Sequence, residues 1–411
     1  MIRLFILLTL LKIQFIIGYT LGGNISGLPN GSTLSLMDNA NNSISNINKN
    51  GSFTINEIFG NRASLYDVKL LTTKFKNATC TITNSRGILY LTNINNINII
   101  CLPIYPMGRP FAASWMDPYG NEYIYGGTTY ASGPSSSDLW KWDGESWKEI
   151  FPKTPDAQWP GSLTTAATWT DNDNAYLYGG YKSLFYVNTL WIYNFASQTW
   201  RSIHPNFPFW LSPGSAWSMK INDIIYGFVL VWETGTTNTN IYKYDPTTES
   251  FTKLSNGSFP NNIQFFQARS YVTSDNKVYI YYNTSGLSNS LWRWDPNSTN
   301  LPTLVPTSTP WPSTFYSPTS WLDNSGNFYV LGATSNLVEL WMYNGNSWVQ
   351  IQPVNGQLWP SNIGANPPAW TDKNSGYSYV FGADVNTSII WKFNNSAINP
   401  QWTIVNNNLS F

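Results

Sequence analysis

The 411-residue sequence is poor in charged and metal-ligating side chains. It contains one histidine, two cysteines and only 11% charged residues, and its formal net charge is zero. A nucleic-acid-binding protein needs a basic stripe for the phosphate backbone, and a polybasic membrane contact needs clustered lysines and arginines. Gly-rich phosphate loops, His/Cys metal sets and nucleophile elbows are missing too. We therefore expect no nucleic-acid partner, no metal and no cofactor.

Long hydrophobic runs are missing except at the start of the chain. A basic residue, Arg3, precedes the mostly apolar stretch Leu4–Ile17, and a small residue, Gly18, follows it. This order is typical of a secretory signal peptide, which we assign to residues 1–18. A membrane anchor is the alternative, but the run is short for a span of about 20 residues. We predict an exported, extracellular protein with no membrane span after signal removal, and a monomer.

Two further features agree with export. Cys80 and Cys101 are expected to bridge each other in an oxidising compartment, two free buried thiols being the alternative. The chain also holds eleven Asn-x-Ser/Thr sequons, each a possible glycan acceptor. The glycosylation candidates we retain are Asn77, Asn256, Asn283, Asn297, Asn386 and Asn394.

The first hundred residues divide by composition. Residues 19–52 are rich in Asn, Ser and Gly, so we expect a disordered linker that buries too little apolar surface to fold. Residues 53–107 are expected to form a small β module that contains both cysteines. The predicted strands lie at Phe53–Ile55, Val68–Leu71, Thr79–Ile82, Ile88–Leu91 and Asn98–Cys101. At the other end of the chain, residues 406–411 form a polar tail.

A short aromatic phrase recurs six times in the remainder, at steps of 51, 51, 50, 49 and 50 residues. A period near 50 indicates stacked or radially arranged units. The six copies are Leu139–Trp142, Leu190–Tyr193, Ile241–Tyr244, Leu291–Trp294, Leu340–Tyr343 and Ile390–Phe393.

Each repeat carries four strand signals and no sustained helical period. In the first repeat they lie at Phe111–Trp115, Glu122–Tyr125, Asp138–Trp142 and Ser146–Ile150. Four strands per unit, six times over, predict an all-β fold: a six-bladed β-propeller over residues 108–405, preceded by the small β module. We expect each blade to come from one continuous stretch, and a strand at 98–105 could add to ring closure.

The repeat also resembles a known motif. The run Trp115–Gly127, the phrase Asp138–Asp143 and the closing Trp147 are similar to the kelch motif of galactose-oxidase-like propellers. The second repeat keeps this pattern with Trp169, Gly179-Gly180 and Trp200. In the later repeats we align the double glycine with Gly227-Phe228, Tyr281-Tyr282, Gly332-Ala333 and Gly382-Ala383. The resemblance implies a propeller fold and leaves function open, because kelch propellers have many roles.

A looser resemblance covers about 50 residues before the repeats. Ile58-Phe59-Gly60, the two cysteines, Pro103 and Gly108 resemble the immunoglobulin-like TIG modules of cell-surface proteins. This resemblance implies an immunoglobulin-like β module, and a cap on the repeats is the alternative.

Galactose-oxidase-like enzymes hold copper with two histidines and two tyrosines, one of them cross-linked to cysteine. This chain has only His204, which we place in an exposed loop, and no cysteine within the repeats. Sialidase-type propellers need an arginine cluster with an acid and a tyrosine nucleophile. Arg109 and Arg269 start inner strands near the channel mouth and are candidates for binding, a salt-bridge or capping role being the alternative. The acidic run Asp171–Asn174 is interpreted as a turn, not a calcium loop.

Aromatic residues in the loops between repeats are the remaining candidates. Trp159, Trp311 and Trp359 recur at blade spacing, which favours packing under their own loops. Residues that the period does not explain are better candidates for stacking on sugars or anchoring a protein. The candidate binding residues are Phe207, Phe209, Trp210, Trp232, Phe265, Phe266, Arg109 and Arg269.

The sequence therefore predicts a secreted, non-catalytic binding propeller that recognises a protein or a glycan through its inter-blade loops. A groove with planar rings would favour carbohydrate, and a flat apolar patch would favour a protein. The alternative is a hydrolase or lyase acting on polysaccharide. It would need two carboxylates within about 5 to 10 Å at the channel mouth.

Overall fold

A computed structural model gives the architecture of the chain. It describes residues 18–28, 32–40, 42–59, 64–71, 78–90, 92–103, 105–128, 135–154, 157–182, 185–205, 211–233, 239–259, 268–282, 289–306, 310–315, 318–334, 337–353, 358–361, 363–382, 388–395 and 400–405. The fold is all-β, and the described residues contain no helix. The chain separates into two compact units, Met1–Tyr105 and Pro106–Phe411. The signal-peptide prediction falls on residues outside the described part, apart from Gly18.

The described residues of the first unit form two four-stranded sheets. One has the order β4-β1-β8-β6, in which β1 and β8 run parallel, and the other has the order β3-β2-β5-β7. Their strands are β1 (Gly18–Ser26), β2 (Leu34–Asp38), β3 (Ser43–Ile47), β4 (Gly51–Phe59), β5 (Ser64–Leu70), β6 (Ala78–Thr83), β7 (Arg86–Leu89) and β8 (Ile94–Pro103).

The prediction of a disordered linker at 19–52 is wrong for the described residues of that stretch. They form β1, β2, β3 and the start of β4, and Leu21, Ile25, Leu34 and Leu36 lie in the core of the unit. Composition misled because the few apolar residues occupy alternate positions of short strands. Strands later in the chain complete their pairing: β1 pairs with β4 and β8, and β2 pairs with β3 and β5. Because β8 belongs to this unit, residues 98–103 do not contribute to ring closure.

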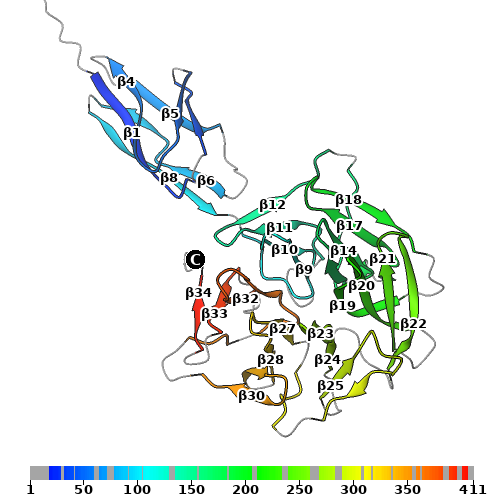
Figure 1. Ribbon diagram of the computed structural model, residues 1–411. Coiled ribbons are helices and arrows are strands. Elements are labelled where there is room, and N and C mark those ends of the chain that lie inside the picture. Colours follow the sequence, from blue (N-terminus) through cyan, green and yellow to red (C-terminus); the bar gives the residue numbers. More distant parts are fainter. Residues whose placement is uncertain are drawn as a thin grey trace, which may run out of the picture. The chain divides into compact units, whose positions relative to one another are not determined.

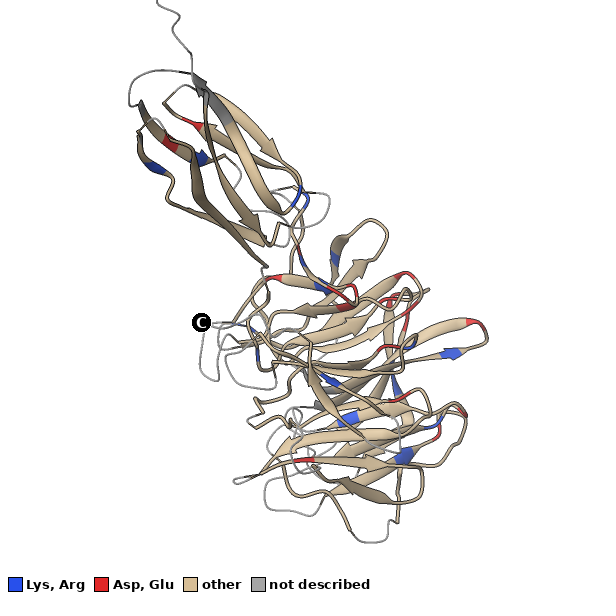
Figure 2. Ribbon diagram, turned by 90° about the vertical axis from the view of Figure 1, so that its left-hand side faces the viewer, with Lys and Arg blue, Asp and Glu red and all other residues tan. Residues whose placement is uncertain are grey.

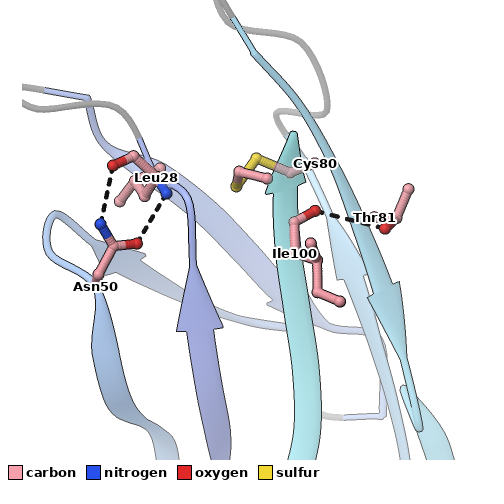
Figure 3. The surroundings of a disulfide bond; sticks show 6 residues. Leu28, Asn50, Cys80, Thr81 and Ile100 are labelled. Atoms are coloured by element: carbon pink, nitrogen blue, oxygen red, sulfur yellow. Dashed lines mark hydrogen bonds between the residues drawn. A yellow bond between two sulfur atoms is a disulfide. The ribbon is translucent and has the colours of Figure 1, made fainter. Parts of the chain in front are cut away.

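The disulfide between Cys80 and Cys101 is present, as predicted (Figure 3). The two cysteines lie directly opposite each other on β6 and β8, so the bridge joins neighbouring strands of one sheet. Beside it the Thr81 hydroxyl donates to the carbonyl of Ile100 at 3.5 Å. At another edge, the Asn50 side chain accepts from the Leu28 N–H at 2.8 Å and donates to its carbonyl at 3.1 Å.

In the second unit the described residues form six four-stranded antiparallel sheets. Each sheet comes from one continuous stretch, as predicted, with its strands in chain order. The first strand of each sheet lies toward a common centre and the later strands toward the rim (Figure 1). The first three sheets hold β9 (Ala113–Met116), β10 (Glu122–Tyr125), β11 (Leu139–Trp142), β12 (Trp147–Ile150); β13 (Ala167–Thr170), β14 (Asn174–Tyr178), β17 (Leu190–Asn194), β18 (Thr199–Ile203); β19 (Leu211–Ile221), β20 (Ile224–Glu233), β21 (Thr239–Asp245), β22 (Ser250–Phe259). The last three hold β23 (Arg269–Val272), β24 (Val278–Tyr282), β25 (Ser290–Trp294), β26 (Thr303–Leu304); β27 (Thr319–Leu322), β28 (Phe328–Ala333), β29 (Val338–Tyr343), β30 (Trp348–Ile351); β31 (Ala369–Thr371), β32 (Ser378–Phe381), β33 (Ile390–Phe393), β34 (Trp402–Ile404).

Stacked aromatic pairs join the first two strands of every sheet. In the first sheet Trp115 lies opposite Tyr123, with ring centroids 5.9 Å apart and planes 6° apart. Such parallel pairs add to the area that each sheet buries. The equivalent pairs are Trp169–Tyr176, Trp217–Phe228, Tyr271–Tyr279, Trp321–Tyr329 and Trp370–Tyr379.

In most sheets the inner-strand aromatic also meets a ring of the next sheet edge-on: the ring centroids of Trp115 and Trp200, for example, are 5.9 Å apart. In the fourth sheet Tyr271 instead stacks on Phe328, with ring centroids 4.3 Å apart. The ring closes between the first and sixth sheets. The ring centroid of Trp147 in the first sheet lies 6.5 Å from that of Trp370 and 5.1 Å from that of Phe381 in the sixth. We call this contact the closure seam. Closure leaves no sheet face uncovered, which is consistent with the blades of a β-propeller.

Strand pairing corrects our alignment of the glycine pair in two repeats. Because Phe228 pairs with Trp217 as Tyr123 pairs with Trp115, the equivalent of Gly126-Gly127 is Val231-Trp232. In the fourth sheet the equivalent is one residue later than expected and begins at Tyr282. The local pattern around Gly227 misled because β19 and β20 are longer than the matching strands of the other sheets.

Positions of both charge signs are distributed over the described part of the ring (Figure 2). The described part of the chain contains no helix with the length and hydrophobicity needed to cross a bilayer.

Candidate functional site

A cavity of about 500 Å³ opens at the end of the ring where the inner strands begin. Its lining comes from β9, β13, β19 and β23, from the segments before β9, β13 and β31, and from the chain that follows β10 and β14. Most of these side chains are small, and several carry hydroxyl groups. They include Ala113, Ser114, Ala167, Thr168, Ser215 and Ala216. We call this space the loop-side cavity.

Three residues at the rim of the loop-side cavity have unusual backbone dihedral angles. Phe111, Thr165 and Asn366 line the cavity, and all three have left-handed φ angles, of 59°, 54° and 50°. Such angles are uncommon for non-glycine residues and are a real outlier for a β-branched threonine. The Thr165 N–H donates to the Phe111 carbonyl at 3.0 Å, and the Phe111 N–H donates to the Ala365 carbonyl at 3.2 Å. Three neighbouring blades thus fix this strained rim, and such strain tends to occur at functional sites.

Two tyrosines form one wall of the cavity. Tyr181 and Tyr186 come from a small hairpin, β15 (Tyr181–Lys182) with β16 (Phe185–Tyr186), inserted after β14. Their ring centroids are 5.3 Å apart with planes at 67°. They are 36% and 42% exposed, and the neighbouring Phe185 is 71% exposed. Aromatic rings held in the open beside hydroxyl groups suit ligands that are apolar on one face and polar at the edges.

The hairpin is positioned by glycine. Gly179 and Gly180 have φ angles of 65° and 99°, which side chains rarely adopt, so the chain can turn sharply after β14. A Cβ atom on Gly180 would also lie 2.7 Å from the Thr164 carbonyl oxygen. The turn lets Tyr181 exchange two backbone hydrogen bonds with Thr164, at 2.8 and 3.1 Å. The tyrosine wall is therefore tied to the strained rim.

Arg269 lines the same cavity from the first residue of β23. Its guanidinium donates to the carbonyl oxygens of Ala268 and Pro318, both at 2.6 Å. Burial lowers the pKa of Arg269 to about 10, so the group keeps its positive charge at neutral pH. The described residues that line the cavity include no carboxylate.

Arg109, the other arginine candidate, has a different environment. It is 4% exposed, pairs through two nitrogens with the Asp138 carboxylate, and donates to the carbonyls of Met107 and Gly126. Burial raises the pKa of Asp138, but the hydrogen bonds and charge of Arg109 outweigh burial and hold the pKa below its ordinary value. This geometry favours the structural alternative for Arg109.

The remaining aromatic candidates are not placed at the site. Phe207, Phe209, Trp210, Phe265 and Phe266 lie outside the described residues. The backbone of Trp232 lies in β20, paired with Ser212 and Thr239, and its side chain is outside the described part.

The recurring loop tryptophans are half-buried and contact neighbouring segments of the ring. Trp159 donates to the Ser137 carbonyl at 2.6 Å, and Trp359 donates to the Val338 carbonyl at 3.1 Å. The ring centroid of Trp311 lies 6.2 Å from that of Trp348. His204 is exposed, as predicted.

A second cavity, of about 690 Å³, lies at the hairpin turns between the first and second strands. Asp117, Asp171 and Asp323 line it, but each carboxylate accepts hydrogen bonds from N–H groups of its own turn. The interpretation of Asp171–Asn174 as a turn is therefore confirmed. No group of three metal-ligating side chains occurs in the part of the chain that the structure describes.

The glycosylation candidates have mixed positions. Asn297 is exposed, Asn394 is half-buried, and Asn256 is half-buried with its amide donating to the Ser298 carbonyl. Asn77, Asn283 and Asn386 lie outside the described residues.

Sequence reasoning missed Tyr181, Phe185 and Tyr186. A signal was present, because three aromatic residues follow Gly179-Gly180 directly, whereas the corresponding run after Gly126-Gly127 contains one. The high aromatic content of the repeats hid this cluster.

No protein-family model and no curated protein matches the chain.

Proposed function

We propose that this chain is a secreted, kelch-like six-bladed propeller that binds carbohydrate, without chemically changing it, in the loop-side cavity. The observation that carries the proposal is the wall formed by Tyr181 and Tyr186 beside small hydroxyl-bearing residues. A sugar ring has an apolar face that packs on aromatic rings and hydroxyl groups that need hydrogen-bond partners. The volume, about 500 Å³, is in the range of small-molecule sites.

Secretion and the kelch assignment rest on the sequence. The aromatic repeat and the glycine pairs support the kelch relationship, and the closed ring of six sheets agrees with it. The disulfide between Cys80 and Cys101 is typical of an oxidising, extracellular-type compartment.

Two other functions receive less support. A protein partner would be favoured by a flat apolar surface, whereas the site is concave and mostly lined by small polar and alanine side chains. A polysaccharide hydrolase or lyase would need two carboxylates free to act, but Asp117, Asp171 and Asp323 are engaged by their own turns.

The test is a glycan-array screen of the secreted chain beside a Y181A/Y186A variant. We expect the variant to lose at least about tenfold in affinity, because the stacking surface is removed. Y119A is the matched control, since Tyr119 is an 81% exposed tyrosine in the turn that follows β9. Unchanged binding by Y181A/Y186A, or equal loss in Y119A, would exclude this site. Release of shortened glycans during incubation would favour the hydrolase or lyase instead.

A further inference from the structure

Five of the sequons have an acceptor asparagine that the structure describes, and the five differ in their surroundings. They are Asn24, Asn50, Asn256, Asn297 and Asn394. A glycan is bulky, so its acceptor has to stand on a surface loop with room beside the amide nitrogen. The structure therefore separates sequons that the motif alone treats as equal.

Asn297 meets this requirement. It is exposed in the turn Asp295–Ser298 between β25 and β26, where the Ser298 N–H donates to the Asp295 carbonyl at 3.1 Å. The backbone N–H of Asn297 donates to the Asp295 carboxylate at 2.9 Å. Its side-chain amide makes no hydrogen bond among the described residues. Thr299, also exposed, supplies the hydroxyl group that the motif requires.

Asn256 reaches the same turn but has a different role. It lies in β22 of the third sheet, is half-buried, and its amide donates to the Ser298 carbonyl. The register between β21 and β22 shifts here, so the segment Lys253–Ser258 bulges away from β21. The nitrogen that would carry a sugar is thus the atom that joins the third sheet to the fourth. A glycan on Asn256 would crowd this contact.

The other three described acceptors fit less well. The side chain of Asn50 is held by both backbone groups of Leu28 (Figure 3). Asn24 is exposed but lies within β1, which is paired with β4 on one side and β8 on the other, and so is not in a loop. Asn394 is half-buried. Among the described acceptors, Asn297 is therefore the best suited to carry a glycan.

The turn Asp295–Ser298 also lies away from the loop-side cavity. It joins the third strand of its sheet to the fourth, and the strands of an antiparallel sheet alternate in direction. It therefore stands at the end of the ring where the first strands turn into the second. The loop-side cavity opens at the other end, where the inner strands begin. A glycan on Asn297 leaves that cavity open.

We propose that Asn297 carries an N-linked glycan and that Asn256 stays unmodified as a contact between the third and fourth sheets. In the modification step the Asn297 amide nitrogen loses a proton and bonds to the anomeric carbon of an oligosaccharide linked to a lipid pyrophosphate. The lipid pyrophosphate is the leaving group. This inference rests on secretion, which is part of the proposed function, because N-linked glycans are added to secreted proteins. It does not depend on what the loop-side cavity binds.

The experiment expresses the full chain in cultured eukaryotic cells and recovers it from the medium. Treatment with peptide N-glycosidase in heavy-oxygen water converts each glycosylated asparagine to a labelled aspartate, which mass spectrometry locates. We expect the label at position 297 and not at position 256. N297Q and T299A should both remove it. S258A, the matched control, destroys the second motif but keeps Asn256, and should leave the label unchanged.

Thermal unfolding of the deglycosylated variants tests the role of Asn256. N256Q should lower the melting temperature by a few degrees, because the hydrogen bond to the Ser298 carbonyl is lost, and N297Q should leave it unchanged. Equal melting temperatures for N256Q and the unchanged chain would overturn this role.

The glycan assignment has its own tests. An unlabelled Asn297, or a labelled Asn256, in chain recovered from the medium would overturn this inference and leave the carbohydrate-binding proposal standing. Retention of unlabelled chain inside the cells would overturn secretion and this inference together.

Discussion

Glu122 lies buried in β10, with only 2% of its surface exposed, in the sheet that forms the closure seam. The equivalent residues of the other sheets are small or apolar, apart from one serine. They are Ala175, Gly227, Val278, Phe328 and Ser378. Burial raises the pKa of Glu122 well above its ordinary value, and the charge of Asp117 raises it further, while a hydrogen bond with Ser114 opposes this.

The raised pKa gives a prediction for stability against pH. Below the unfolded-state pKa of about 4.3, Glu122 is protonated in both the folded and the unfolded state. The stability that depends on its protonated form is then fully present. As pH rises, the unfolded chain ionises first, so that contribution is lost. We expect E122Q, which cannot ionise, to raise the melting temperature by a few degrees at about pH 7.5 and to have little effect at about pH 4.

Thermal unfolding followed by circular dichroism at the two pH values would measure this difference. S114A is a useful companion variant, because it removes the hydrogen-bond partner of Glu122 and leaves the acid in place. An equal effect of E122Q at both pH values would mean that Glu122 does not titrate in this range.

At the scale of the element, inter-sheet packing relies on close contact of rings with backbone. Where the second sheet packs on the third, the indole of Trp169 in β13 lies against the backbone of Gly227 in β20. Any side chain at position 227 would collide with this ring. A Cβ atom there would lie 2.2 Å from the indole Nε1 and 2.4 Å from Cε2, so the ring or the strand must move. The glycine is kept for space, since its φ angle is not in the left-handed region.

We therefore expect G227A to destabilise the ring by about 1 to 3 kcal/mol through overpacking. The companion variant W169F removes the atoms that the new methyl group would meet, although it costs packing by itself. In a double-mutant cycle the combined loss should be smaller than the sum of the two single losses, with a coupling of at least about 0.5 kcal/mol. Urea unfolding would measure the three free energies. Additive losses would show that the methyl group is accommodated elsewhere.

For the whole molecule, the division into two units gives the disulfide a local role. Cys80 and Cys101 are buried in the core of the first unit, and the bridge closes a separation of 21 residues. A loop of this size stabilises by about 3 kcal/mol through the unfolded state. The second unit has its own aromatic cores and contains no cysteine.

We expect the C80A/C101A variant to lower the transition of the first unit and leave the transition of the ring unchanged. Scanning calorimetry would separate the two transitions, and glycan binding at the loop-side cavity should persist. The single variant C80S is the comparison, since it leaves one thiol free. A shift of the ring's transition by the double variant would show that the two units unfold together.

Much of the architecture was readable from the sequence. The aromatic spacing gave six units, and the alternation within each gave four strands, because each blade is a local hairpin series. Register in the third blade was not readable, since Gly227-Phe228 imitates the glycine pair and only the pairing of Trp217 with Phe228 distinguishes them. The strands within residues 19–52 were missed because two of them pair with strands farther along the chain, β1 with β8 and β2 with β5.

The sequence by itself determined the period, the disulfide and the scarcity of charge, because these depend on composition and local order. Only the tertiary structure decided which residues share the loop-side cavity. The sequence placed both Arg109 and Arg269 at the start of inner strands, but Arg109 precedes β9, whereas Arg269 is the first residue of β23. Asp138, 29 residues from Arg109, pairs with Arg109, whereas Arg269 lines the same cavity as Tyr181 and Tyr186. Such juxtapositions arise when sheets close on one another, and no periodicity along the chain encodes them.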